Sequence, residues 1–236
     1  MLEVSKLRRD FGGLTAVHDL TFKVEAGEIV GLIGPNGAGK TTTFSMLAGF
    51  IPPTSGDIVF QGKSILGLKP HQVCKLGVTR TFQIVQPFPD MTILENVMVG
   101  AYARYTGTVD ARRKALEVLE RVNLAHKANT LGKNLNLLEL KRLEIGKALA
   151  TEPSLLLLDE VAAGLKDAEV DNILVLVRQL NKEGITFLIV EHLMKVIMNL
   201  SHRVIVLDFG QMIAQGTPDE ITKDPAVLEA YLGKEA

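Results

Sequence analysis

The chain has 236 residues, of which 47% are hydrophobic, and its 26 basic against 27 acidic side chains leave a formal net charge of −1. This length is enough for one large core or for a core with a small attached lobe, and we expect a single domain over residues 1–236. The balanced charge excludes the broad basic surface that binds a nucleic-acid backbone, so no nucleic acid is expected as a partner.

The first thirty residues alternate between apolar and polar side chains, with turn signals at Gly12-Gly13 and Ala26-Gly27. This pattern predicts an antiparallel sheet that leads into a short buried strand over residues 28–33. Phe11 lies just before the first turn, where its flat ring could stack on a nucleotide base. From this stretch alone, the pattern favours an ordinary core or edge aromatic.

A glycine-rich loop follows that strand, and it fits the phosphate-loop pattern G-x-x-x-x-G-K-[ST] at every fixed position. The glycines let the backbone bend so that successive N–H groups reach phosphate oxygens, Lys40 can reach the β- and γ-phosphates, and the Thr41 hydroxyl can hold Mg²⁺. Residues 41–48 can form a helix whose N-terminus points at the anion. The predicted phosphate-binding residues are Gly34, Pro35, Asn36, Gly37, Ala38, Gly39, Lys40, Thr41 and Thr42.

The middle of the chain changes from strand to helix patterns. Strands are predicted over 57–62 and 77–83, and the second ends at Gln83, a neutral amide that can contact a metal or a water without competing for charge. Residues 84–91 form an apolar, proline-broken loop that either packs inward or waits for a partner. From Thr92 to about Ala150 the apolar spacing becomes helical, which predicts an inserted helical lobe.

The second half alternates between strands and helices again. Strands are predicted over 154–160, 185–190 and 204–208, with a helix over 167–181. Successive all-apolar strands joined by helices favour a parallel sheet that is covered on both faces. The expected fold class is therefore α/β, with a mainly parallel core sheet, an N-terminal antiparallel β lobe and an inserted α-helical subdomain.

Polar side chains follow two of these strands, at the edge where ligands bind in such sheets. Asp159 emerges after four leucines and can hold Mg²⁺, usually through water. Glu160 points elsewhere if side chains alternate along an extended backbone, which frees it to polarise a water that attacks a γ-phosphate. His192, taken alone, is a helix cap or a satisfied core residue; beside a phosphate it could donate to that phosphate or orient the water.

Two observations bear on the compartment. The longest apolar runs, such as residues 155–158, fall far short of the roughly 18 residues of a membrane-spanning helix. Any membrane role must therefore come through a partner. The single cysteine, Cys74, cannot form an internal disulfide, and this favours a reducing cytoplasm.

The phosphate loop, Gln83, the helical insert, Asp159-Glu160 and His192, in this order and at these spacings, resemble the nucleotide-binding subunit of ATP-binding cassette transporters. The resemblance covers essentially the whole chain. Further segments are similar to the branched-chain amino acid importer group, which also includes urea and short-amide importers. These segments span residues 11–17, 80–83, 91–97, 143–150 and 162–165.

The resemblance implies a P-loop ATPase cassette in which residues 1–91 and 151–236 form the nucleotide-binding core and residues 92–150 the helical subdomain. Phe11 would stack on the base, in place of the core position that the local pattern favours, and Val17 would join it in binding the nucleotide.

Four further residues take roles from the family. Gln83 would contact the metal and sense both the γ-phosphate and the membrane subunit. Asp159 would be the magnesium acid, Glu160 the general base and His192 the switch histidine. The implied cofactors are ATP and Mg²⁺.

The implied partners are integral-membrane permease subunits and a second cassette ATPase, with an extracytoplasmic solute-binding protein acting indirectly. The groove near residues 84–91 would receive a short cytoplasmic helix of the permease, so the chain would be peripheral on the inner face of the plasma membrane. A soluble cassette ATPase and a weakly catalytic regulatory subunit are the alternative functions.

The family's signature, normally Leu-Ser-Gly-Gly-Gln, is altered in this chain. The matching residues, which would face a partner's nucleotide, are Leu135, Asn136, Leu137, Leu138 and Glu139. Two small residues have become leucines, and Glu139 would repel phosphate unless it turns away. Val161 replaces the usual proline, and Lys166 stands where an aspartate or asparagine is expected. We therefore expect pairing with a different cassette subunit and two unequal ATP sites, a homodimer being the alternative.

Overall fold

Two β-sheets form the framework of the protein. The structure is a computed structural model, and it describes residues 1–82 and 86–232. The larger sheet has the strand order β10-β9-β3-β8-β7-β6, all parallel except β10, which is antiparallel to β9 at one edge. The mainly parallel core sheet expected from the sequence is thereby confirmed. Its strands are β3 (Ile29–Ile33), β6 (Val78–Arg80), β7 (Leu155–Asp159), β8 (Thr186–Val190), β9 (Arg203–Asp208) and β10 (Gln211–Gly216).

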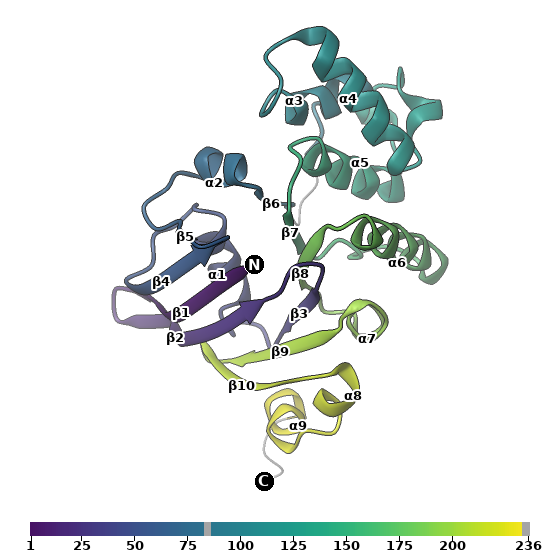
Figure 1. The fold of residues 1–236 in the computed structure, drawn as a ribbon. Helices are drawn as coiled ribbons and strands as arrows, with labels where there is room; N and C mark the ends of the chain where they lie inside the picture. Colours follow the sequence, from purple (N-terminus) through teal and green to yellow (C-terminus); the bar gives the residue numbers. More distant parts are fainter. Residues whose placement is uncertain (83–85, 233–236) are drawn as a thin grey trace.

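The smaller sheet is antiparallel, with the order β2-β1-β4-β5, and it confirms the N-terminal β lobe. Its strands are β1 (Leu2–Phe11), β2 (Leu14–Val24), β4 (Ser55–Phe60) and β5 (Lys63–Ser64). Figure 1 shows this sheet and α1 (Lys40–Leu47) on one side of the core sheet. The helices α6 (Asp167–Lys182) and α7 (Met194–Leu200) lie on the other side.

The strand β7 shows why the core strands are apolar along their whole length. Side chains of a strand alternate between its two faces. Leu156 and Leu158 accordingly pack with α6, whereas Leu155 and Leu157 pack with α1 and the antiparallel sheet. Both faces are thus covered, and only the end of the strand is left to carry polar side chains.

The remaining helices lie around the edges of the two sheets. They are α2 (Pro70–Leu76), α3 (Ile93–Ala101), α4 (Thr108–Arg121), α5 (Leu137–Leu149), α8 (Pro218–Ile221) and α9 (Pro225–Leu232), with 3₁₀ turns at Ala125–Lys127 and Gly132–Asn134. In Figure 1, α3, α4 and α5 gather at one end of the molecule, and α8 and α9 lie next to β10. No helix within the described ranges has the length and apolar character needed to cross a membrane.

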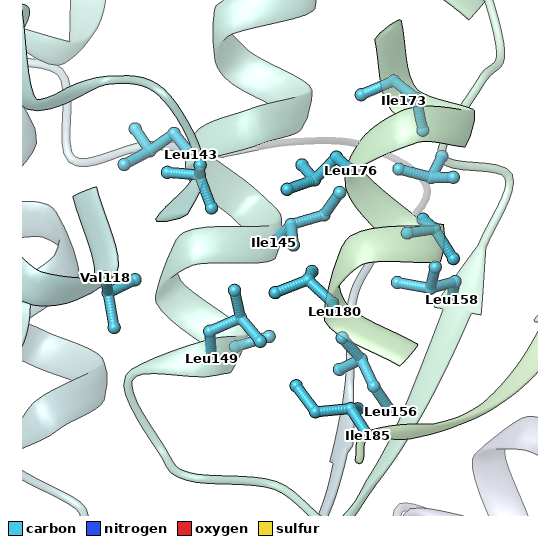
Figure 2. Close-up of a cluster of buried hydrophobic side chains, with 14 of the residues drawn as sticks. Val118, Leu143, Ile145, Leu149, Leu156, Leu158, Ile173, Leu176, Leu180 and Ile185 are labelled. Carbon is cyan, nitrogen blue, oxygen red and sulfur yellow. The ribbon is translucent and has the colours of Figure 1, made fainter. Parts of the chain in front are cut away.

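Helix α5 joins the helical end of the molecule to the core sheet. Figure 2 shows its side chains between α4 on one side and α6 and β7 on the other. All of these elements contribute to one hydrophobic cluster, so α5 packs directly against the core of the molecule. On its far side, α5 lies so close to α3 that a Cβ on Gly100 would be 2.2 Å from the carbonyl oxygen of Lys147. The division into a core and a helical subdomain at residues 92 and 150 stays a prediction.

A pair of substitutions on α6 tests this packing. Leu180 of α6 is fully buried in the cluster that α6 forms with α5 and β7, whereas Val175, also on α6, is 62% exposed. Leu180→Ala should lower the free energy of unfolding by about 2–5 kcal/mol because it leaves a cavity. Val175→Ala should change it by less than about 0.5 kcal/mol. Urea denaturation of the two variants measures both values, and equal losses would contradict the described packing.

Candidate functional site

The phosphate loop runs from the end of β3 to the start of α1 and is pressed against its neighbours. A Cβ on Gly34, where φ is 151°, would lie 2.0 Å from the carbonyl oxygen of Leu207. A Cβ on Gly39, where φ is 95°, would lie 2.5 Å from the carbonyl oxygen of Ala16. Both positions therefore require glycine. Gly39 is also the N-cap of α1 and makes no side-chain bond, so the first N–H groups of α1 are left for an anion.

Lys40 is folded back onto the loop that it follows. Its Nζ donates to the carbonyl oxygens of Gly34 at 2.7 Å and Pro35 at 2.8 Å, and the side chain is buried. Burial lowers the pKa of Lys40, and the charges of Glu160 and Asp159 oppose that shift. Neutral carbonyls are weaker acceptors for an ammonium group than phosphate oxygens are. A phosphate that enters the loop can therefore replace these two carbonyls as the hydrogen-bond acceptor of the Lys40 ammonium group.

A cavity of about 370 Å³ collects most of the predicted nucleotide-binding residues. Phe11 lines it and is 45% exposed, with the guanidinium of Arg9 4.5 Å from the centre of its ring. Glu160 and His192 also line it; they come from the second half of the chain and follow the ends of β7 and β8. The lining residues are Phe11, Leu14, Ala16, Asn36, Gly37, Ala38, Gly39, Lys40, Thr41, Thr42, Glu160 and His192.

Val17, which the family resemblance assigns to nucleotide binding, lies beneath the cavity residues of β2. The side chain is fully buried and is not part of the cavity wall; Ala16 and Leu14 line the cavity instead. Its Cγ2 lies against Gly39, so any contribution of Val17 to nucleotide binding would be indirect, through support of the loop. The reason is strand alternation, since β2 turns Val17 towards the core.

Glu160 and His192 form a contact at the end of the core sheet. The distance from Glu160 Oε1 to His192 Nε2 is 3.0 Å, with Glu160 mostly buried and His192 about half exposed. Strand β7 ends at Asp159, and Glu160 already has a left-handed backbone with φ of 48°. The two acids therefore diverge because the chain turns at Glu160, and not only because strand side chains alternate. A carboxylate held in this way can polarise a water molecule.

Asp159 lines a second cavity, of about 530 Å³, which shares Thr41 with the first. Its Oδ2 accepts from Nη2 of Arg80 at 2.6 Å, and both side chains are at least nine-tenths buried. Arg80 also donates from Nη1 to Ser45 Oγ at 2.9 Å. Sequence reasoning missed this partner. The signal was an arginine at the end of a strand that pairs directly with β7.

The oxygen atoms around Thr41 fit a hard divalent cation. The Thr41 hydroxyl and the Asp159 carboxylate border the same cavity, and Mg²⁺ is commonly held by one or two protein oxygens together with substrate phosphates. Gln83, the third predicted metal contact, lies outside the described residues. Its neighbours Phe82 and Gln86 both line this second cavity.

The altered signature segment stands apart from both cavities, at the N-terminus of α5. Asn136 is the N-cap: its side chain accepts from the Glu139 N–H, and its own N–H donates to the Glu139 carboxylate. Burial alone would raise the pKa of Glu139, but the hydrogen bond from Lys127 and that from the Asn136 N–H lower it overall. The Glu139 carboxylate is thus turned back onto the start of α5, and Lys127 balances its negative charge.

The leucines of the segment are used for packing. Leu137, 41% exposed, lies against Gly164, where an added Cβ would come within 3.1 Å of its Cδ2. Leu135 and Leu138 are partly buried and pack against the large cluster that surrounds α5. The segment therefore presents apolar side chains where the family pattern has two glycines.

Comparison with known proteins places these features in a family context. Residues 17–163 match the family model described as ABC transporter, and residues 211–236 match one described as branched-chain amino acid ATP-binding cassette transporter. The chain is 41% identical to the high-affinity branched-chain amino acid transport ATP-binding protein BraF of Pseudomonas aeruginosa and 40% identical to LivG of Escherichia coli, which has the same description. Each alignment covers 99% of this chain and 98% of the relative.

A solved structure agrees over the same length. The ADP conformation of an ATP-binding cassette of an ABC transporter matches with a TM-score of 0.91 at 31% identity, covering 99% of both chains. The first family match includes the phosphate loop, α5 and Glu160, and the second includes β10, α8 and α9.

Proposed function

The chain belongs to the ABC transporter family of ATP-binding subunits, and from that premise we propose that it powers import of branched-chain amino acids or of related small polar solutes such as urea and amides. Subunits of this family hydrolyse ATP to drive transport. The observation that carries the proposal is the cavity that Phe11, Lys40, Glu160 and His192 share. The sequence identity of 41% to BraF and 40% to LivG, together with the family match at residues 211–236, supports branched-chain amino acids or related solutes as the cargo.

The geometry supports a division of labour for ATP hydrolysis. Lys40 and the first N–H groups of α1 bind the phosphates, and Phe11 stacks on the base. Thr41 and Asp159 offer the oxygen atoms that would hold Mg²⁺, which supplies charge neutralisation for the phosphates. Glu160 accepts a proton from the attacking water as its oxygen bonds to the γ-phosphorus and ADP leaves. His192 Nε2 lies 3.0 Å from the Glu160 carboxylate, holds it in place and would contact the same phosphate.

Exposed aromatic side chains support docking to a permease. Phe50, Phe82 and Phe88 are each nearly half exposed, and the rings of Phe50 and Phe82 meet edge to face at 5.7 Å. Exposed apolar surface of this kind is typical of a protein partner. A cytoplasmic helix of a permease seated here would hold the chain on the inner face of the membrane, with a solute-binding protein acting through that permease.

We further infer that the partner ATPase is a different subunit. In this chain the Asn136 side chain already accepts a hydrogen bond from the Glu139 N–H of α5, and Glu139 pairs with Lys127. Leucines stand where the backbone would have to approach the partner's nucleotide closely. The partner's signature would complete the ATP site at Lys40, and this site would hydrolyse ATP at the full rate. The partner's phosphate loop, closed by residues 135–139 of this chain, would bind ATP and turn over slowly.

Glu160→Gln tests the catalytic assignment. The amide keeps the size of the side chain but cannot take up a proton, so ATP turnover should fall by at least about 100-fold. ATP affinity should stay within about threefold because Lys40 and the loop bind the phosphates. Turnover is measured by phosphate release and affinity by fluorescent-nucleotide titration. Glu117→Gln, on the outer face of α4, is the matched control. An unchanged turnover in Glu160→Gln would favour a regulatory subunit that only binds nucleotide.

Phe11→Ala tests base stacking separately from phosphate binding. Loss of a stacked ring typically costs about 1–3 kcal/mol, so ATP affinity should fall roughly 5- to 150-fold. Affinity for inorganic tripolyphosphate, which has no base, should not change. Tyr102→Ala, an equally exposed aromatic on the helical end, should leave both affinities as they are. Equal losses for ATP and tripolyphosphate would contradict the stacking role.

The unequal-site proposal is tested on the chain alone and in its assembly. Purified by itself, the chain should bind ATP but hydrolyse it much more slowly than the assembled transporter does. Replacing Leu137 and Leu138 with glycine should bring no strong gain in hydrolysis while the partner is missing. Full transporter-level turnover by the isolated chain, or a strong gain from the two glycines alone, would show that two copies of this chain suffice.

A further inference from the structure

Two buried charged residues near Glu160 and His192 have no role in the site as described above. Lys141 on α5 is 4% exposed, and Glu191 at the end of β8 is 3% exposed. Neither side chain lines the two cavities at the phosphate loop. Burying charged groups is costly unless they are paired and hydrogen-bonded, so their partners are informative.

Lys141 holds the backbone of Glu160. Its Nζ donates to the Glu160 carbonyl oxygen at 2.9 Å, and on the other side the Glu160 N–H donates to Val190 at 2.9 Å. Glu160 has a φ of 48°, a conformation that costs free energy for a residue with a Cβ. Such a conformation persists only where the surroundings fix it, and Lys141 provides one of the contacts that do so, beside the Val190 carbonyl and the Ala163 N–H, which donates to the Glu160 carbonyl oxygen at 3.2 Å.

Glu191 lies directly before His192 in the chain, and its side chain holds the backbone that follows Glu160. Its Oε1 accepts from the Ala162 N–H at 2.8 Å, two residues after Glu160. Burial raises the pKa of Glu191, while hydrogen bonds from the backbone of Ala162 and of His192 oppose that shift. The Glu191 side chain therefore ties the segment after Glu160 to the end of β8, where His192 is the next residue.

The two buried charges also act on each other. Burial lowers the pKa of Lys141, and the charge of Glu191 is the largest effect that opposes it. Because Lys141 lies on α5, two residues after the signature segment, its bond to Glu160 connects that segment with the end of β7.

We propose that Lys141 and Glu191 are a positioning pair that fixes the backbone around Glu160 and His192, so that α5 supports the catalytic residues. This inference rests on the proposed function of Glu160 and His192 in ATP hydrolysis. Neither Lys141 nor Glu191 lines the cavities around Lys40 and Thr41. Their removal should therefore impair the chemical step and leave ATP binding intact.

Lys141→Met and Lys141→Arg test the pair in the ATP-hydrolysing assembly purified through this chain. Misplacing a catalytic group by about 1 Å can cost on the order of 100-fold, so Lys141→Met should lower kcat by about 10- to 100-fold. KM for ATP should stay within about twofold, because the phosphate loop is untouched. Lys141→Arg keeps the charge and the donor and should recover most of kcat.

Two reference variants separate the possible failures. Lys114→Met is the matched control, since Lys114 is a largely buried lysine of the helical end that pairs with Glu117 and Glu152, and its loss should leave kcat unchanged. In a Glu160→Gln background, Lys141→Met should add no further loss, because both act through the same group. If Glu160→Gln itself keeps full turnover, the proposed function fails. If it loses turnover and Lys141→Met does not, only the positioning pair fails.

Glu191→Gln approaches the pair from the other side and serves if Lys141→Met does not fold. The amide oxygen can still accept the Ala162 N–H, but the charge facing Lys141 is lost. We expect kcat to fall by about 3- to 10-fold with KM for ATP unchanged. A parallel loss of kcat and ATP affinity in either variant, or the absence of rescue by Lys141→Arg, would overturn the proposal in favour of a general structural role.

Discussion

The parallel register of β3, β8 and β7 is the constraint on which the site depends. Val190 of β8 pairs with Leu32 of β3 on one side and with Asp159 of β7 on the other. This one row sets the phosphate loop, Glu160 and His192 at the same edge of the sheet. Because side chains have a period of two along a strand, a slip of one residue in either pairing would turn the following side chains to the opposite face.

Charge buried close to that edge is the second feature that shapes the site. Arg80 pairs with Asp159, and Lys141 and Glu191 hold the backbone around Glu160. Apolar side chains of similar volume would often be as stable in such positions or more so. The charges are therefore better explained by the fixed geometry they give to the two acids at the end of β7 than by a gain in stability.

The sequence predicted the fold and the phosphate loop well because their signals are local. Four leucines before Asp159 and the glycine pattern before Lys40 need no knowledge of distant partners. The lysine on α5 that contacts Glu160 reads as an ordinary helix charge, and only the packing of α5 on β7 shows its partner. The turn of Glu139 towards Lys127 depends on tertiary contacts in the same way. Phe11 was assigned through family resemblance, since its local pattern is that of a core aromatic.

A structure of the assembled Glu160→Gln transporter with Mg-ATP is the most direct test of the central claim. The account predicts that the γ-phosphate lies at the shared edge of β3, β7 and β8, in contact with Lys40 and His192 and beside residue 160. Mg²⁺ should lie between Thr41 and Asp159. A nucleotide bound elsewhere on the chain, or a γ-phosphate out of reach of both Lys40 and His192, would contradict the account.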